Sequence, residues 1–189
     1  MATELKDYIR CYDEVVDKEF CRDVITRFES DAEYQERIDR EKRPSFTELN
    51  ISKRFLAEDK NWIDIQQKIK SLFVDYVQLY MSDLDVSVDF PARYAFEEFR
   101  IKKYNTSADE FKDHVDVGDH ASARRFLVCF LYLNTVENGG STDFPKLDYS
   151  IQPQCGRILM FPSTWMYRHA GRPVELGKKY IAGSYLHYL

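Results

Sequence analysis

The segment Tyr94-Ala-Phe-Glu-Glu-Phe-Arg-Ile-Lys-Lys-Tyr104 decides the fold class of this chain. It is rich in residues that favour β-strands, and its polar and apolar side chains partly alternate, which predicts a strand. Turn signals such as Asn138-Gly-Gly140 separate the shorter runs that follow. We expect further strands at 111–117, 125–134, 141–144, 150–152, 157–161, 167–170 and 179–187. About eight short strands at this spacing are typical of a β-sandwich or jelly roll.

Residues 1–90 have a different pattern, which predicts mainly helix. Asp17 can cap a helix over residues 19–29. A second amphipathic helix is expected over 61–80, because apolar side chains recur there at three- and four-residue steps: Trp62, Ile65, Ile69, Phe73, Val77 and Tyr80. The polar, basic stretch between the two helices is either a mobile loop or a short strand. We therefore expect an α+β fold that is mainly β, with a jelly-roll core over 91–189 and the N-terminal helices packed on one sheet, in a single domain.

The composition excludes several classes of protein. Of the 189 residues 44% are hydrophobic and 15% aromatic, enough for a buried core, which excludes intrinsic disorder. The net charge of −5 argues against nucleic-acid binding through bulk positive charge. No apolar stretch is long enough for a membrane span, and the charged first residues lack the apolar region of a signal peptide. We expect a soluble cytoplasmic protein without a nucleic-acid or membrane partner; the sequence does not define its oligomeric state.

Three side chains form a candidate metal site. In Asp113-His-Val-Asp116, the side chains of His114 and Asp116 would point to the same face of a strand, because alternate residues share a face. His169 lies on a later predicted strand. If the two strands are opposite each other, two imidazoles and one carboxylate converge. This set binds Fe(II) in oxygenases and leaves coordination positions open.

Lys179 is a candidate for binding an anion in the same barrel. It lies near the start of the last predicted strand, ten residues after His169. A pocket for a dicarboxylate needs a buried cation to pair with the carboxylate far from the metal, and a lysine ammonium can do this. Lys178 would point to the opposite face of that strand, toward solvent.

These residues lie in five ordered segments that resemble Fe(II)- and 2-oxoglutarate-dependent dioxygenases of the prolyl 4-hydroxylase type. The resemblance covers roughly residues 94–189. Its segments are Tyr104 followed by Phe111-Lys-Asp-His-Val-Asp116; Arg125-Phe-Leu-Val-Cys-Phe-Leu-Tyr-Leu-Asn134; Gly139-Gly-Ser-Thr-Asp-Phe-Pro145; Gln152-Pro-Gln-Cys-Gly-Arg-Ile-Leu-Met-Phe-Pro162; and His169-Ala-Gly-Arg-Pro-Val-Glu-Leu-Gly-Lys-Lys-Tyr180.

The resemblance implies a double-stranded β-helix (jelly-roll) core and specific roles for individual residues. His114, Asp116 and His169 would be the catalytic metal ligands. Lys179 would bind the C5 carboxylate of 2-oxoglutarate, and the Tyr104 hydroxyl would lie near that cosubstrate or Tyr104 would be an aromatic residue of the barrel wall. The implied cofactors are Fe(II), 2-oxoglutarate and O2, with ascorbate as a reductant. The intact Asp116 favours hydroxylation over halogenation.

The implied substrate is a proline residue in a protein or peptide. The segment from Glu41 to Phe55 is the candidate for a lid over that substrate, although an ordinary surface loop explains its polarity equally well. Two alternatives stay open. The same chemistry could act on a small molecule or free amino acid, or the chain could be a zinc- or manganese-binding jelly-roll module without turnover.

Overall fold

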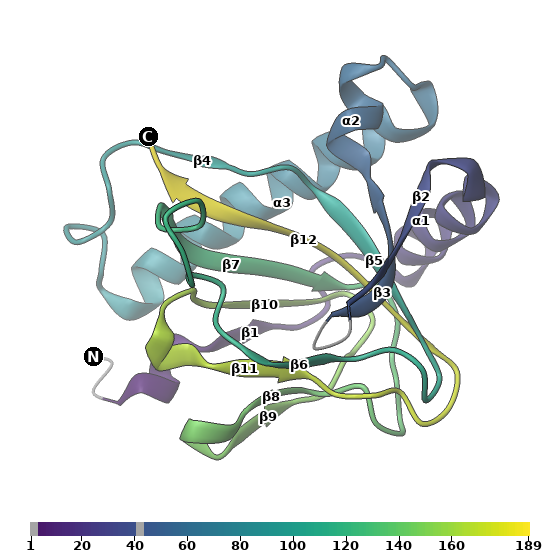
Figure 1. Cartoon of the computed structure of the whole chain (residues 1–189). Helices are drawn as coiled ribbons and strands as arrows, with labels where there is room; N and C mark the ends of the chain where they lie inside the picture. The colour runs from purple at the N-terminus through teal and green to yellow at the C-terminus, as the bar shows by residue number, and fades with distance from the viewer. Residues whose placement is uncertain (1–3, 41–43) are drawn as a thin grey trace.

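Two antiparallel sheets form the centre of the fold (Figure 1). The structure is a computed structural model, and it describes residues 4–40 and 44–189. The larger sheet has the order β1 (Arg10–Tyr12), β10 (Arg157–Pro162), β7 (Arg125–Tyr132), β12 (Lys178–Tyr188), β5 (Arg100–Asn105), β3 (Ser45–Asn50) and β2 (Gln35–Asp39), with β4 (Tyr94–Phe96) also paired to β12. The smaller sheet has the order β6 (Phe111–His114), β11 (His169–Gly171), β8 (Thr142–Phe144) and β9 (Tyr149–Ile151). This arrangement confirms the predicted mainly β, jelly-roll fold.

Three α-helices come from the N-terminal half: α1 (Lys18–Ser30), α2 (Ile51–Leu56) and α3 (Lys60–Leu84). Single 3-10 turns, η1 (Leu5–Tyr8), η2 (Ala32–Tyr34), η3 (Pro145–Leu147) and η4 (Trp165–Tyr167), lie between other elements. The Asp17 carboxylate caps α1 as expected, accepting a hydrogen bond of 2.7 Å from the Phe20 N–H. All six apolar residues predicted to face the core from α3 are buried. Within 4–40 and 44–189, no helix combines the length and the apolar character that a bilayer crossing requires.

The central strands β7 and β10 of the larger sheet are apolar on both faces because both faces are covered there. Along β7, Leu127, Cys129 and Leu131 belong to the cluster that α1 and α3 cover. The alternate residues Val128 and Tyr132 belong to a second cluster, which residues of the smaller sheet complete. The period of two along each strand thus separates a helix-facing side from an inner side. The candidate site lies on the inner side.

The N-terminal half is mostly helical, but it also adds strands to both edges of the larger sheet, β1 at one edge and β2 with β3 at the other. The sequence pattern did not predict β1 and β2. β3, from the stretch left open as loop or strand, pairs with both β2 and β5. Of the candidate lid, residues 41–43 lie outside the described residues. The remainder is not a free loop, because it forms β3 and the helix α2.

The predicted strand over 94–104 is two strands. β4 and β5 both pair with β12, but residues 97–99 leave the strand path between them. The Phe99 carbonyl there accepts a hydrogen bond of 3.0 Å from the Ile51 N–H, at the beginning of α2. The interruption therefore joins the sheet to the helix that follows β3.

Candidate metal and cosubstrate site

Two neighbouring strands of the smaller sheet bring the two histidines together. His114 on β6 and His169 on β11 are direct partners in the antiparallel register, and their ring centroids are 4.3 Å apart. The prediction that Asp116 lies on the same strand as His114 is wrong, because β6 ends at His114. The turn after β6 nevertheless returns the Asp116 carboxylate to the histidines. One ligand atom from each of the three residues lies within 4.8 Å of the others.

Backbone carbonyls orient both imidazoles. His114 Nδ1 lies 2.8 Å from the Lys112 carbonyl oxygen, and His169 Nδ1 lies 3.0 Å from that of Tyr167. A carbonyl can only accept, so Nδ1 carries the proton in each ring and Nε2 presents its lone pair. The two Nε2 atoms face the Asp116 carboxylate at 3.7 and 3.6 Å, too far for hydrogen bonds.

The environment holds His169 and Asp116 in the protonation states that a metal requires. Burial lowers the pKa of His169 to about 4, so this imidazole is neutral at pH 7. Burial alone would raise the pKa of Asp116, but the two imidazoles and the Tyr185 hydroxyl outweigh it and lower the pKa to about 2. His114 Nε2 and Asp116 Oδ2 are buried without a hydrogen-bond partner. Such atoms are costly to leave unpaired, and a cation bound between them would satisfy both, so the residues fit a metal ion.

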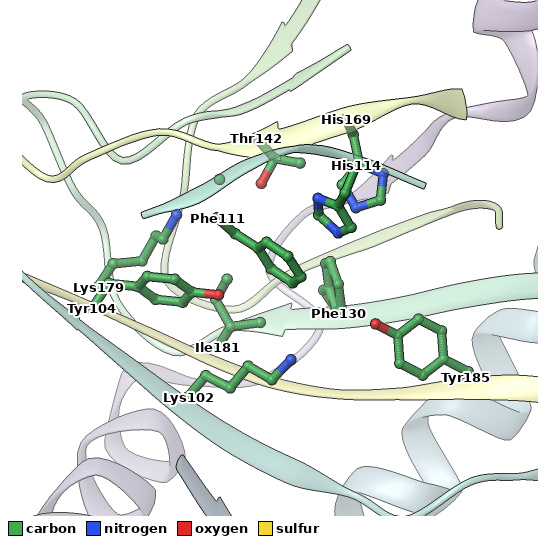
Figure 2. Close-up of a pocket in the computed structure, with 11 residues that line it drawn as sticks. Lys102, Tyr104, Phe111, His114, Phe130, Thr142, His169, Lys179, Ile181 and Tyr185 are labelled. Carbon is green, nitrogen blue, oxygen red and sulfur yellow. The ribbon is translucent and has the colours of Figure 1, made fainter. Parts of the chain in front are cut away.

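The same cavity contains a buried cation at its other end. The cavity is lined by residues that include His114, His169, Tyr104 and Lys179 (Figure 2). Lys179 is fully buried; its Nζ donates a hydrogen bond of 2.7 Å to the Gly140 carbonyl. Among the residues that the structure describes, no carboxylate lies within ion-pair distance of this ammonium. The site therefore offers a positive charge to an anion that enters the cavity.

Comparisons with known proteins agree with this geometry. Residues 99–187 match the sequence model of the family described as the 2OG-Fe(II) oxygenase superfamily. This match covers 89 of the 189 residues, a little less than half of the chain. The match agrees with the expectation of Fe(II) and 2-oxoglutarate that the resemblance implied, and the three converging side chains fit a metal ion.

Several proteins to which this chain is similar are prolyl hydroxylases by name. The chain is 27% identical over 107 residues to prolyl 4-hydroxylase subunit alpha-1 of Gallus gallus, and the match covers 48% of this chain but only 20% of that protein. The viral collagen prolyl hydroxylase of Paramecium Bursaria Chlorella virus-1, solved as a 2OG complex, has a TM-score of 0.71 at 20% identity, with 96% of each chain covered. A prolyl-4-hydroxylase of Pseudomonas putida has a TM-score of 0.70 at 16% identity, with 96% of this chain and 93% of that chain covered.

A peptide complex is also among the solved structures with this fold. The prolyl hydroxylase of Trichoplax adhaerens, in complex with a peptide fragment of the hypoxia inducible factor oxygen degradation domain, has a TM-score of 0.70 at 14% identity. The alignment covers 95% of this chain and 83% of the hydroxylase chain. At these identities the likeness to the solved structures is one of fold.

Tyr104 lies directly beside Lys179. The two residues are partners in the pairing of β5 with β12, and Lys179 Nζ lies 4.7 Å from the centroid of the Tyr104 ring. Burial raises the pKa of the Tyr104 hydroxyl, which is therefore a neutral donor at any physiological pH. Tyr104 is both part of the cavity lining and part of the core between the sheets, so its two predicted roles are compatible.

Sequence reasoning missed Tyr185, which contacts a predicted ligand. Its hydroxyl donates a hydrogen bond of 3.0 Å to Asp116 Oδ1. The Arg125 guanidinium lies 4.2 Å above the Tyr185 ring and is itself held by the Glu97 carboxylate through two hydrogen bonds of 2.8 Å. The alternation of side chains along β12 could have identified Tyr185, because residues 179, 181, 183 and 185 share the inner face.

Proposed function

We propose that this chain is a single-domain dioxygenase that hydroxylates a proline residue of a peptide or protein, with Fe(II), 2-oxoglutarate and O2. One observation carries the proposal: three potential ligand atoms converge at a cavity that two of the three residues line, and the same cavity contains a buried ammonium without an ion-pair partner. In this proposal His114, Asp116 and His169 hold the metal, and Lys179 binds the far carboxylate of 2-oxoglutarate beside Tyr104.

The protein residues have distinct tasks in this reaction. When bound, Fe(II) activates O2 with 2-oxoglutarate, so that a C–H bond of the substrate is hydroxylated and succinate and CO2 are released. The two imidazoles and the carboxylate would hold the metal and would leave coordination positions open for the cosubstrates. Tyr185 and the two backbone carbonyls hold the ligands in orientation, which preserves metal affinity. Lys179 fixes the direction in which 2-oxoglutarate lies, and the apolar wall around it limits access of water.

A peptide substrate is supported by the polar groove that lies beside β3. This groove is lined by residues of β2, β3, α2 and β5, including Glu48, Lys53, Arg54 and Arg100. Part of it comes from the described portion of the candidate lid, and an extended peptide can use such a groove for polar contacts. The named relatives act on proline residues, according to their names, and one of them is solved with a peptide.

Succinate release coupled to peptide oxidation tests this function. The chain, loaded with Fe(II), is incubated with 2-oxoglutarate and a set of proline-containing peptides, and both succinate and the mass increase of one oxygen atom are measured. We expect coupled hydroxylation of a peptide, loss of both signals in Asp116→Ala, and full activity in Asp119→Ala, which removes an exposed carboxylate nearby. Coupling only with free amino acids or other small molecules would contradict the peptide substrate.

A further inference from the structure

Lys102 is a second cation on the wall of the site cavity. It lies on β5, two residues before Tyr104, and therefore points to the same inner face. Its Nζ lies 4.7 Å from the ring centroid of Phe46 and 6.0 Å from that of Phe111. In Figure 2 its side chain extends from the lower strand toward the same space that Tyr104 and Phe111 face.

Among residues 4–40 and 44–189, no carboxylate lies within ion-pair distance of this ammonium, and the charges of Glu48 and Asp116 act on it only from farther away. Glu48 faces it across the β3–β5 pairing, but Glu48 pairs with Arg100 at 3.5 Å, and Arg100 also pairs with Glu98. Burial lowers the pKa of Lys102, as expected for a cation with mainly aromatic neighbours. Aromatic faces stabilise an ammonium only in part, so an anion would find an unused charge here.

The position of Lys102 assigns it to the substrate and not to the cosubstrate. A second hollow, lined by Glu98, Arg100 and Gly183, shares Lys102, Phe130, Ile181 and Tyr185 with the site cavity. Lys179 lines the site cavity but not the second hollow. The two lysines therefore lie toward different ends of the space that the cavity and the hollow form together. With 2-oxoglutarate between Lys179 and the metal ligands, a molecule that reaches the metal through the second hollow passes Lys102.

We propose that Lys102 binds a carboxylate of the substrate next to the carbon that is hydroxylated. The inference rests on the proposed function and narrows its substrate class to peptides with an acidic side chain beside the target proline. A charge-assisted hydrogen bond from this partly buried ammonium would set both the affinity and the position of such a peptide. A free amino acid could supply the same carboxylate, so the test includes one.

Binding measurements without turnover test the assignment. The whole chain is loaded with Mn(II) and an unreactive 2-oxoglutarate mimic, and calorimetry measures the affinity of three probes. These are a short peptide with glutamate on both sides of a central proline, the same peptide with glutamine in both places, and free L-proline. The variants are Lys102→Met, which removes the charge at similar volume, Lys102→Arg, which keeps it, and Lys178→Met as a control at an exposed position of β12.

We expect the wild type to bind the glutamate peptide at least about 10-fold more tightly than the glutamine peptide, as a hydrogen bond to a charged group implies. Lys102→Met should abolish that preference, whereas Lys102→Arg should keep most of it and Lys178→Met all of it. Affinity for the 2-oxoglutarate mimic should not change in Lys102→Met. Equal affinities for two peptides that both bind, no binding of any probe, or weaker binding of the mimic in Lys102→Met would overturn the assignment.

The two remaining outcomes separate the inference from the proposed function. Lys102-dependent binding of L-proline alone would support the carboxylate contact and contradict a peptide substrate. Lys102-dependent binding of the glutamate peptide, without any oxygen added when Fe(II) and 2-oxoglutarate replace the inactive pair, would support the contact and contradict prolyl hydroxylation.

Discussion

Replacing Tyr185 with phenylalanine should weaken metal binding without disturbing the fold. The substitution removes only the hydroxyl that donates to Asp116 Oδ1 at 3.0 Å. The aromatic ring stays, and with it the Arg125 guanidinium that packs on its face. Asp116 Oδ1 then loses the hydrogen bond that orients the carboxylate, and the carboxylate can rotate away from the two imidazoles.

The expected loss follows from the type of hydrogen bond. A bond to a charged group contributes about 1.5–3 kcal/mol, and removal of a group that orients a metal ligand typically costs about 10- to 100-fold in affinity. The dissociation constant for Mn(II) should therefore rise by about 10- to 100-fold in Tyr185→Phe. Protonation of Asp116 does not contribute to this loss of affinity at pH 7. Removal of the Tyr185 hydroxyl raises the pKa of Asp116, but from a value of about 2, so the carboxylate stays ionised at pH 7.

Titration of the metal-free chain with Mn(II) at pH 7 measures this constant. Tyr180→Phe is the matched control, because Tyr180 lies on the same strand and its hydroxyl also donates to a carboxylate, that of Glu29, at 2.6 Å. The control should bind Mn(II) like the wild type. A folded Tyr185→Phe variant whose Mn(II) affinity changes less than about 2-fold, well below the range for such supporting contacts, would refute the reasoning.

Three further predictions concern the cosubstrate and the packing. Burial lowers the Lys179 pKa to about 7, so the ammonium loses its proton above that pH. The dissociation constant of 2-oxoglutarate from the Mn(II)-loaded chain should therefore rise about 10-fold per pH unit above pH 7. A Lys179→Arg variant should show no such rise, and a flat wild-type profile would contradict the role of Lys179. Gly156 has a φ of +78°, and an added Cβ would lie 2.6 Å from the Val16 carbonyl oxygen. Gly156→Ala should therefore lower the free energy of unfolding, measured by urea titration, by about 2–4 kcal/mol. An unchanged free energy of unfolding would contradict this contact. Phe73 is fully buried between α3 and the larger sheet, and Phe73→Ala should cost about 3–5 kcal/mol by the same measurement; a cost below about 1 kcal/mol would contradict the packing of that helix.

The sequence was sufficient to predict the elements whose side chains repeat with a clear period. The apolar stripe from Trp62 to Tyr80 predicted α3 because a helix must bury one continuous face. The short strands after Tyr94 were predictable for the same reason, since each is bounded by turn residues. β1 and β2 could not be predicted, because they are short edge strands and owe their pairing to partners far along the chain.

The candidate site was predictable in its residue types but not in its supporting contacts. His114, Asp116 and His169 have a spacing with chemical meaning, although the path of the chain after His114 differs from a strand. Lys179 was predictable because alternation buries it and exposes Lys178. Lys102 and the Tyr185 contact depend on how three strands face one another across the cavity, and no local pattern contains that information.

A structure of the chain with Mn(II) and an unreactive 2-oxoglutarate mimic tests the central claim most directly, with the ion located by anomalous scattering. The account predicts one ion bound by His114 Nε2, His169 Nε2 and an oxygen of Asp116, with the mimic extending from it to Lys179. An ion at other residues, or a mimic whose far carboxylate lies away from Lys179, would contradict it.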